Sequence, residues 1–197
     1  MKATKQTFDV PQKKVHLCDS DRILVAIAEE FVKTTELIPV GMNENGEMQY
    51  SEQEKTQYAY NTYWLDNPTK SADALSVAKQ EVLKELTAYD ASSEVNSFSI
   101  NGTTAWLDKT TRIVKMNSAT IAKRKGQQKT TLWLGDTKLD LDCDKAIELL
   151  ADIEMYAQEC FDVTAAHRQA IEELTDIADV LQYDYKSGYP DKLEITL

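Results

Sequence analysis

Apolar residues near the start of the chain recur three to four positions apart, as on one face of a helix. The set consists of Ile23, Leu24, Ile27 and Phe31. This spacing predicts a helix over residues 21 to about 33, with Asp19 or Ser20 as its N-cap.

The segment that follows has the pattern of a β-hairpin. Two short runs, residues 37–40 and 47–50, flank Asn45-Gly46, a pair that strongly favours a tight turn between strands. Pro39 has no backbone N–H to donate, so it limits the first strand to the edge of a sheet. Residues 51–64 are polar and rich in tyrosine without a clear period.

Beyond residue 67, helical and strand-like patterns alternate. Helical spacing predicts helices over residues 71–89, 109–125, 146–160 and 167–181. Asp108 and Gly126 bound the second of these, which has Leu107, Val114 and Ile121 as its expected inward stripe. A turn at Asp162-Val163 is expected between the last two, and the final helix is expected to be capped again at Thr175.

Two hairpins and a short strand complete this part of the chain. The turn signals Asn101-Gly102 and Gly135-Asp136 predict hairpins over residues 98–107 and 131–141, and residues 193–196 have the composition of a strand. The whole pattern predicts an α+β fold, in which helices pack on small antiparallel β-hairpins. We expect a docking region over residues 1–67, with a helix and a hairpin, and a mostly helical α+β domain over residues 68–197.

Charge is distributed unevenly along the chain. Seventeen acidic and ten basic residues precede position 109, and sixteen acidic and five basic residues follow position 129. Between them lies a stretch with seven basic residues and no acidic one, which we call the basic segment: Lys109, Arg112, Lys115, Lys123, Arg124, Lys125 and Lys129. We expect this segment to pair mainly with the acidic C-terminal helices, because the net charge of −11 would repel a polyanion such as nucleic acid.

Composition excludes several classes of protein. Three scattered cysteines without CxxC spacing indicate reduced thiols in a reducing compartment. The longest apolar run has six residues, far from the roughly 20 that span a bilayer. The N-terminus lacks the apolar core of a signal peptide, so we expect synthesis in the cytoplasm and no membrane partner.

No arrangement of residues indicates catalysis. Neither His16 nor His167 has a nucleophile or carboxylate near it in sequence, and we expect His167 to be packed on the apolar side of its helix. Asp140, Asp142 and Asp144 resemble the start of a calcium loop, but Lys145 and Ala151 occupy the positions of the required glycine and glutamate. We therefore predict no catalytic residues, no metal and no cofactor.

Two groups of residues are candidates for binding a partner. Tyrosine and tryptophan are enriched at interface hot spots, which points to one group: Tyr50, Tyr58, Tyr60, Tyr63 and Trp64. A core patch is an equal alternative for these aromatics. The second group is an acidic stripe on a C-terminal helix: Glu148, Asp152 and Glu159.

Many short motifs follow one another between about Ala78 and the end of the chain: Ala88-Tyr89-Asp90, Val95-Asn96-Ser97-Phe98, Asn101-Gly102, Trp106-Leu107-Asp108-Lys109, Thr111-Arg112, residues 130–135, Tyr156-Ala157, Cys160-Phe161, Val163-Thr164, His167, Tyr183-Asp184-Tyr185, Gly188-Tyr189-Pro190 and Lys192-Leu193. In these motifs the chain resembles a family of tailed phages and prophages classed only as domain of unknown function 4376. Residues 1 to about 67 are not covered.

The resemblance implies a virion or tail-assembly protein without established catalytic residues. Its expected partners are other phage structural proteins, such as tail-fibre or baseplate components, and a homo-oligomer stays open as well. The alternative is an acidic effector that binds a host defence or DNA-handling protein through the acidic stripe. An enzyme on an unrecognised fold is the least favoured hypothesis, because titratable groups are few and scattered.

Overall fold

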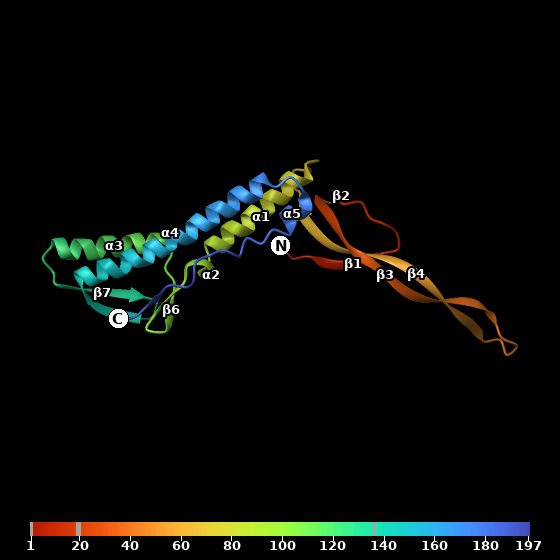
Figure 1. The fold of residues 1–197 in the computed structure, drawn as a ribbon, viewed down its shortest axis with the longest axis horizontal. Coiled ribbons are helices and arrows are strands. Elements are labelled where there is room, and N and C mark those ends of the chain that lie inside the picture. Colours follow the sequence, from red (N-terminus) through yellow and green to blue (C-terminus); the bar gives the residue numbers. More distant parts are fainter. Residues whose placement is uncertain (1, 19–20, 136) are drawn as a thin grey trace. The chain divides into compact units, whose positions relative to one another are not determined.

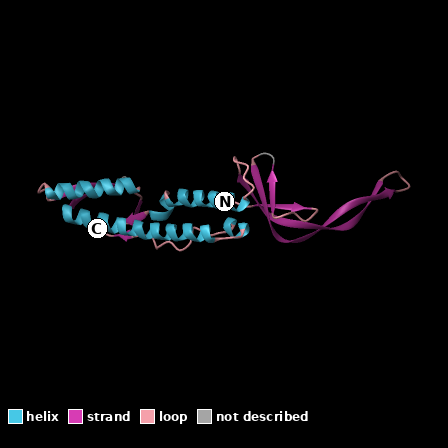
Figure 2. Cartoon of the chain, turned by 90° about the horizontal axis from the view of Figure 1, so that it is seen from above, coloured by secondary structure: helices cyan, strands magenta, loops and turns pink. Residues whose placement is uncertain are grey.

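The computed structural model describes residues 2–18, 21–135 and 137–197, and the chain forms two compact units. Unit 1 comprises residues 1–82 together with 175–182, and unit 2 comprises residues 83–174 together with 183–197. The division falls within a helix, α1 (Ala74–Asp90). The mixture of helices and small, mainly antiparallel sheets confirms the predicted α+β class (Figures 1 and 2).

Unit 1 is built on a four-stranded antiparallel sheet with the order β1-β4-β3-β2. Its strands are β1 (Thr4–Phe8), β2 (Val15–Cys18), β3 (Arg22–Met42) and β4 (Met48–Asp66). β1 pairs with β4 only as far as Tyr58, and β2 pairs with β3 only as far as Val25. Beyond these short strands, β3 and β4 continue alone as a twisted two-stranded ribbon (Figure 1). We call its residues 33–56 the arm.

The helix predicted over residues 21–33 is wrong, because residues 22–42 form strand β3. Its proposed N-caps, Asp19 and Ser20, lie outside the described residues. Ile23 and Val25 are fully buried on one side of the sheet, and Ala26 is buried on the other. A strand covered on both faces reads as a continuous apolar run, which short sequence windows cannot distinguish from a helix.

The base of this sheet carries the buried core of unit 1. The short helix α5 (Ile177–Leu181) belongs to this unit and is tied to the segment before β2 by the ion pair between Asp176 and Lys14, at 2.6 Å. Buried apolar residues of the unit come from the sheet, α1 and α5: Ile23, Val25, Tyr63, Leu65, Ala74, Val77, Ala78, Val82, Ile177, Val180 and Leu181.

Unit 2 packs two long helices against short strands. Its further elements are α2 (Ser93–Asn96), β5 (Phe98–Ile100), β6 (Thr103–Ala105), α3 (Lys109–Arg124), β7 (Lys129–Leu134), β8 (Thr137–Asp142), α4 (Cys143–Glu173) and β9 (Glu194–Ile195). β5 pairs with β6 in a hairpin and with β9 in parallel, while β7 and β8 form a separate hairpin. The main core joins these strands to α3 and α4: Phe98, Ile100, Ala105, Leu107, Ala119, Leu132, Leu134, Ala146, Leu149, Leu150 and Ile153.

Most predicted elements of unit 2 are confirmed. Asp108 caps α3 by accepting from the Thr111 backbone N–H at 2.9 Å, and Gly126 follows the helix with φ +77°. Both predicted hairpins and the terminal strand form, and Asp136, which the sequence placed in the second turn, lies outside the described residues. Among the described residues, no helix is long and apolar enough to cross a membrane.

Two predictions about the helices of unit 2 are wrong. The turn at Asp162-Val163 does not form, because α4 continues unbroken and the buried Thr164 hydroxyl lies 3.2 Å from the Cys160 carbonyl within it. α4 ends instead at Glu173, and Asp176 then caps α5. The predicted inward stripe of α3 also fails beyond Leu107, which is buried, since Val114 and Ile121 are each 56% exposed.

Candidate functional site

The arm carries an apolar face that nothing in the described structure covers. Cross-strand partners in an antiparallel pair lie on the same face, and faces alternate along each strand. Met42 pairs with Met48 and Pro39 with Tyr50, while Leu37 lies two positions further on the same side. The apolar face therefore consists of Leu37, Pro39, Met42, Met48 and Tyr50, with exposed fractions of 48–69% for the four large side chains.

The opposite face of the arm is mainly polar. Gln49, Ser51 and Gln53 lie on it, with Ile38 and Val40 as apolar exceptions. Register shifts by one residue between Pro39 and Gly41, and Gly41 has φ +149° at this bulge. The sequence predicts that Pro39 lies on an edge strand. This is confirmed, because around Pro39 strand β3 pairs only with β4.

The tip of the arm is a well-bonded turn. The Asn43 side-chain oxygen accepts from the backbone N–H groups of Asn45 and Glu47 at 3.0 and 2.9 Å. Gly46 has φ +79°, as the predicted Asn45-Gly46 turn requires. Glu44 and Glu47 lie in and beside this turn, and Glu52 pairs with Leu37 on β3.

The five aromatic residues singled out from the sequence do not form one surface. Tyr60 and Tyr63 are each 6% exposed, and the Tyr60 hydroxyl accepts from the Gln12 backbone N–H at 2.9 Å. Tyr58 is half-buried, Trp64 is 46% exposed at the base of the sheet, and Tyr50 lies in the arm. Tyr60 and Tyr63 thus belong to the core alternative, whereas Tyr50 and Trp64 are available to a partner.

The acidic stripe and the basic segment lie in unit 2. Glu148, Asp152 and Glu159 are all exposed along one side of α4. Pairing between the basic segment and α4 is confirmed at two places: Arg112 with Glu154 at 2.6 Å, and Lys123 with Asp144.

His167 is packed as expected, with Nδ1 2.9 Å from the Tyr183 hydroxyl and Nε2 2.9 Å from the Ser187 carbonyl.

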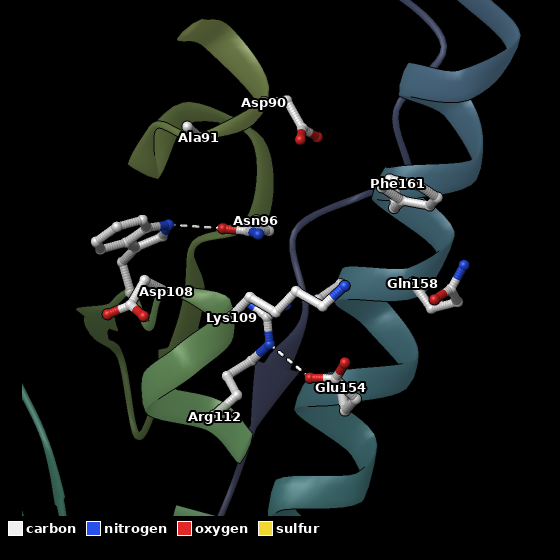
Figure 3. Close-up of a pocket in the computed structure, with 11 residues that line it drawn as sticks. Asp90, Ala91, Asn96, Asp108, Lys109, Arg112, Glu154, Gln158 and Phe161 are labelled. Atoms are coloured by element: carbon white, nitrogen blue, oxygen red, sulfur yellow. Dashed lines mark hydrogen bonds and ion pairs between the residues drawn. The ribbon is translucent and has the colours of Figure 1, made fainter. Parts of the chain in front are cut away.

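Unit 2 also contains a pocket of about 270 Å³ that the sequence gave no direct reason to expect. It lies where the end of α1, α2, the start of α3 and the middle of α4 converge (Figure 3). Its lining consists of Asp90, Ala91, Asn96, Trp106, Asp108, Lys109, Arg112, Glu154, Ala157, Gln158 and Phe161. One signal could have pointed to it: Arg112 is a charged residue at a buried position of its helix, with Lys109 one turn before it.

Hydrogen bonds fix several polar groups of this pocket. The Trp106 indole N–H donates to the Asn96 side-chain oxygen at 2.6 Å, so the Asn96 amide nitrogen remains available. Asp108 accepts from the hydroxyl and backbone N–H of Thr111, which holds the pKa of its carboxyl below the usual value. Asp90 accepts from the Thr164 hydroxyl at 2.8 Å.

A family model described as a domain of unknown function, DUF4376, matches residues 77–187. The chain belongs to the DUF4376 family. No curated protein and no solved structure matches it. The DUF4376 segment contains every residue that lines the pocket, whereas the arm lies outside that segment. The protein therefore joins a family domain with a pocket to an N-terminal extension that carries the arm.

Proposed function

We propose that this DUF4376 protein is a structural or assembly component of a tailed-phage particle, and that it acts through protein–protein contacts made by the arm. The apolar face of the arm carries the proposal. An isolated two-stranded ribbon is only marginally stable in water, and contiguous exposed apolar surface usually marks an interaction site. Leu37, Met42, Met48 and Tyr50 supply such a surface far along the ribbon.

The charges around this face define the chemistry of the partner. Glu52 pairs with Leu37, Glu44 and Glu47 lie at the turn that ends the arm, and across residues 33–56 five acidic residues outnumber two basic ones. A partner with an apolar groove rimmed by Lys or Arg complements this arrangement. An anionic membrane surface does not, because it would repel the acidic rim.

The phage assignment rests on the resemblance of the C-terminal part to proteins of tailed phages and prophages. In this proposal the protein is made in the host cytoplasm and enters the virion, where a tail-fibre or baseplate protein receives the arm. No catalytic step, metal or cofactor is part of the proposal.

Two matched double variants test the arm. Met48→Ser with Tyr50→Ser removes apolar surface from one face, and Gln49→Ser with Gln53→Ser alters the opposite face of the same strand. Tagged protein would be recovered from infected or induced cells, and co-purifying phage proteins and purified particles would be compared by mass spectrometry. We expect the first variant to lose the phage partner and the second to keep it. The proposal would be overturned if both variants kept the phage partner. It would also be overturned if the wild-type protein were absent from particles and from every tail complex.

A second candidate function follows from the acidic stripe. Glu148, Asp152 and Glu159 are exposed and form no ion pair with any described residue, so they could meet a basic host protein as an acidic effector. Replacing all three by glutamine should then abolish a host interaction that also weakens as salt is raised. Unchanged host binding by this triple variant would exclude the effector.

A further inference from the structure

The pocket of unit 2 contains a guanidinium that is held at two of its nitrogens and has no described partner at the third. Arg112 has a side chain 9% exposed, and its Nε donates to Glu154 at 2.6 Å while Nη1 donates to the Leu107 carbonyl at 2.8 Å. Nη2 has no hydrogen-bond partner among the described residues. The two N–H groups of Nη2 and the second N–H of Nη1 are left, and one from each nitrogen can form the fork that matches a carboxylate.

A second cation reaches the same space from one turn earlier. Lys109 extends from α3 towards α4, across the pocket and beside Arg112 (Figure 3). Its ammonium forms no ion pair with any described residue. The carboxylates nearest to these cations are already engaged, because Glu154 binds Arg112 and Asp108 caps α3.

The other groups that line the pocket include a carboxylate and two aromatic rings. Asp90 lies at the other end of the pocket from Arg112, and only one of its two oxygens receives the Thr164 hydroxyl. The second oxygen can accept from a nitrogen donor. Trp106 and Phe161 both line the pocket, and Phe161 is 52% exposed, so an apolar side chain bound there would cover it.

From this arrangement we propose that the pocket binds the α-carboxylate and the adjacent nitrogen of an apolar or aromatic amino-acid residue. Arg112 and Lys109 hold the carboxylate, Asp90 accepts from the nitrogen, and Trp106 and Phe161 enclose the side chain. A free amino acid and the carboxyl-terminal residue of a peptide share this chemistry. The proposal is independent of the arm, so either can fail without the other.

The test uses NMR on the full-length chain, with the Trp106 indole N–H resonance as the reporter. The probes are free L-phenylalanine, N-acetyl-phenylalanine and N-acetyl-phenylalanine amide. We expect a saturable shift with at least one of the two carboxylate probes, and binding of the amide at least tenfold weaker. Tighter binding of free phenylalanine assigns the site to an amino acid, and tighter binding of the acetylated probe assigns it to a peptide end.

Matched variants separate the pocket from general charge effects. Lys109→Ala should weaken binding about tenfold, while Lys125→Ala removes the same charge near the far end of α3 and should leave binding unchanged. Arg112→Lys keeps the charge but removes the fork, and should weaken binding with a native circular dichroism spectrum. Equal binding of the amide, no saturable shift with any probe, or equal effects of Lys109→Ala and Lys125→Ala would overturn the proposal.

Discussion

Arg112 on α3 and Glu154 on α4 form an ion pair of 2.6 Å in which the arginine is nine-tenths buried and the glutamate is 43% exposed. Removing the carboxylate would leave a buried guanidinium with one anchor fewer. We expect Glu154→Ala to lower the free energy of unfolding by about 1–3 kcal/mol, the cost of leaving a buried polar group without a partner.

Urea denaturation followed by circular dichroism measures this effect. Glu159→Ala is the matched control, because Glu159 is exposed on the same helix and should change stability by less than about 0.5 kcal/mol. Equal stability of the two variants would show that the Arg112–Glu154 pair contributes little to the packing of α3 on α4.

Tyr156 makes the stability of unit 2 depend on pH at the alkaline end. It is 7% exposed, and burial raises the pKa of its hydroxyl to about 12. The folded state therefore holds this proton more tightly than the unfolded chain, where a tyrosine titrates near 10. Its contribution is fully present below about pH 10 and is lost as pH rises towards 12, on the order of 2 kcal/mol.

The comparison of wild type with Tyr156→Phe isolates this contribution. Phenylalanine keeps the ring but cannot ionise. We therefore expect the unfolding free energy of Tyr156→Phe to fall less than that of wild type between pH 9 and pH 11.5. Lysines lose their charges in the same range, and this affects both proteins alike. Parallel pH profiles of the two proteins would show that Tyr156 is not responsible.

Local signals predicted unit 2 better than unit 1. The Asp108 cap, Gly126 and the Asn101-Gly102 turn each act within a few residues, so they can be recognised without knowing the rest of the fold. Strand β3 differs, because its pairing partners lie far away in sequence: Arg22 pairs with Asp66, 44 positions on. Without that pairing, its apolar run is equally consistent with a helix.

The candidate sites show the same limit. The Asn45-Gly46 turn was predicted, but the length of the arm depends on how early β1 and β2 stop pairing. The aromatic cluster divides between core and surface because alternate residues of a strand face opposite sides, as the buried Tyr63 and the exposed Trp64 do. The pocket brings Asp90 and Phe161 together across 71 positions, and no motif marks such a convergence.

The arm should be dispensable for folding. Thr35 pairs with Glu54 in the β3–β4 register, so a two-residue Asn-Gly turn can join these positions in place of residues 36–53. The removed side chains are mostly exposed, and the buried core of unit 1 is retained. We expect the thermal midpoint to stay within a few degrees of wild type, while binding of the phage partner is lost. A large drop in the midpoint would mean that the arm stabilises the fold.

The three cysteines should differ in reactivity by their burial. Cys18 is partly exposed, whereas Cys143 and Cys160 are 3% and 1% exposed, and burial raises the pKa of the Cys160 thiol. The thiolate is the reactive form, so alkylation by iodoacetamide at pH 8, followed by mass spectrometry, should modify Cys18 first.

His167→Ala should then accelerate the modification of Cys160 alone. His167 holds the segment around Tyr183 and Ser187 onto α4, and Tyr189, from the same segment, packs against the cluster that contains Cys160. Loosening this segment exposes the thiol more often, and we expect a severalfold increase in its rate. Cys143 is the first residue of α4, with its Sγ 3.2 Å from the Gln127 carbonyl, and it serves as the internal control. A uniform rise at both buried cysteines would indicate general destabilisation instead of local opening.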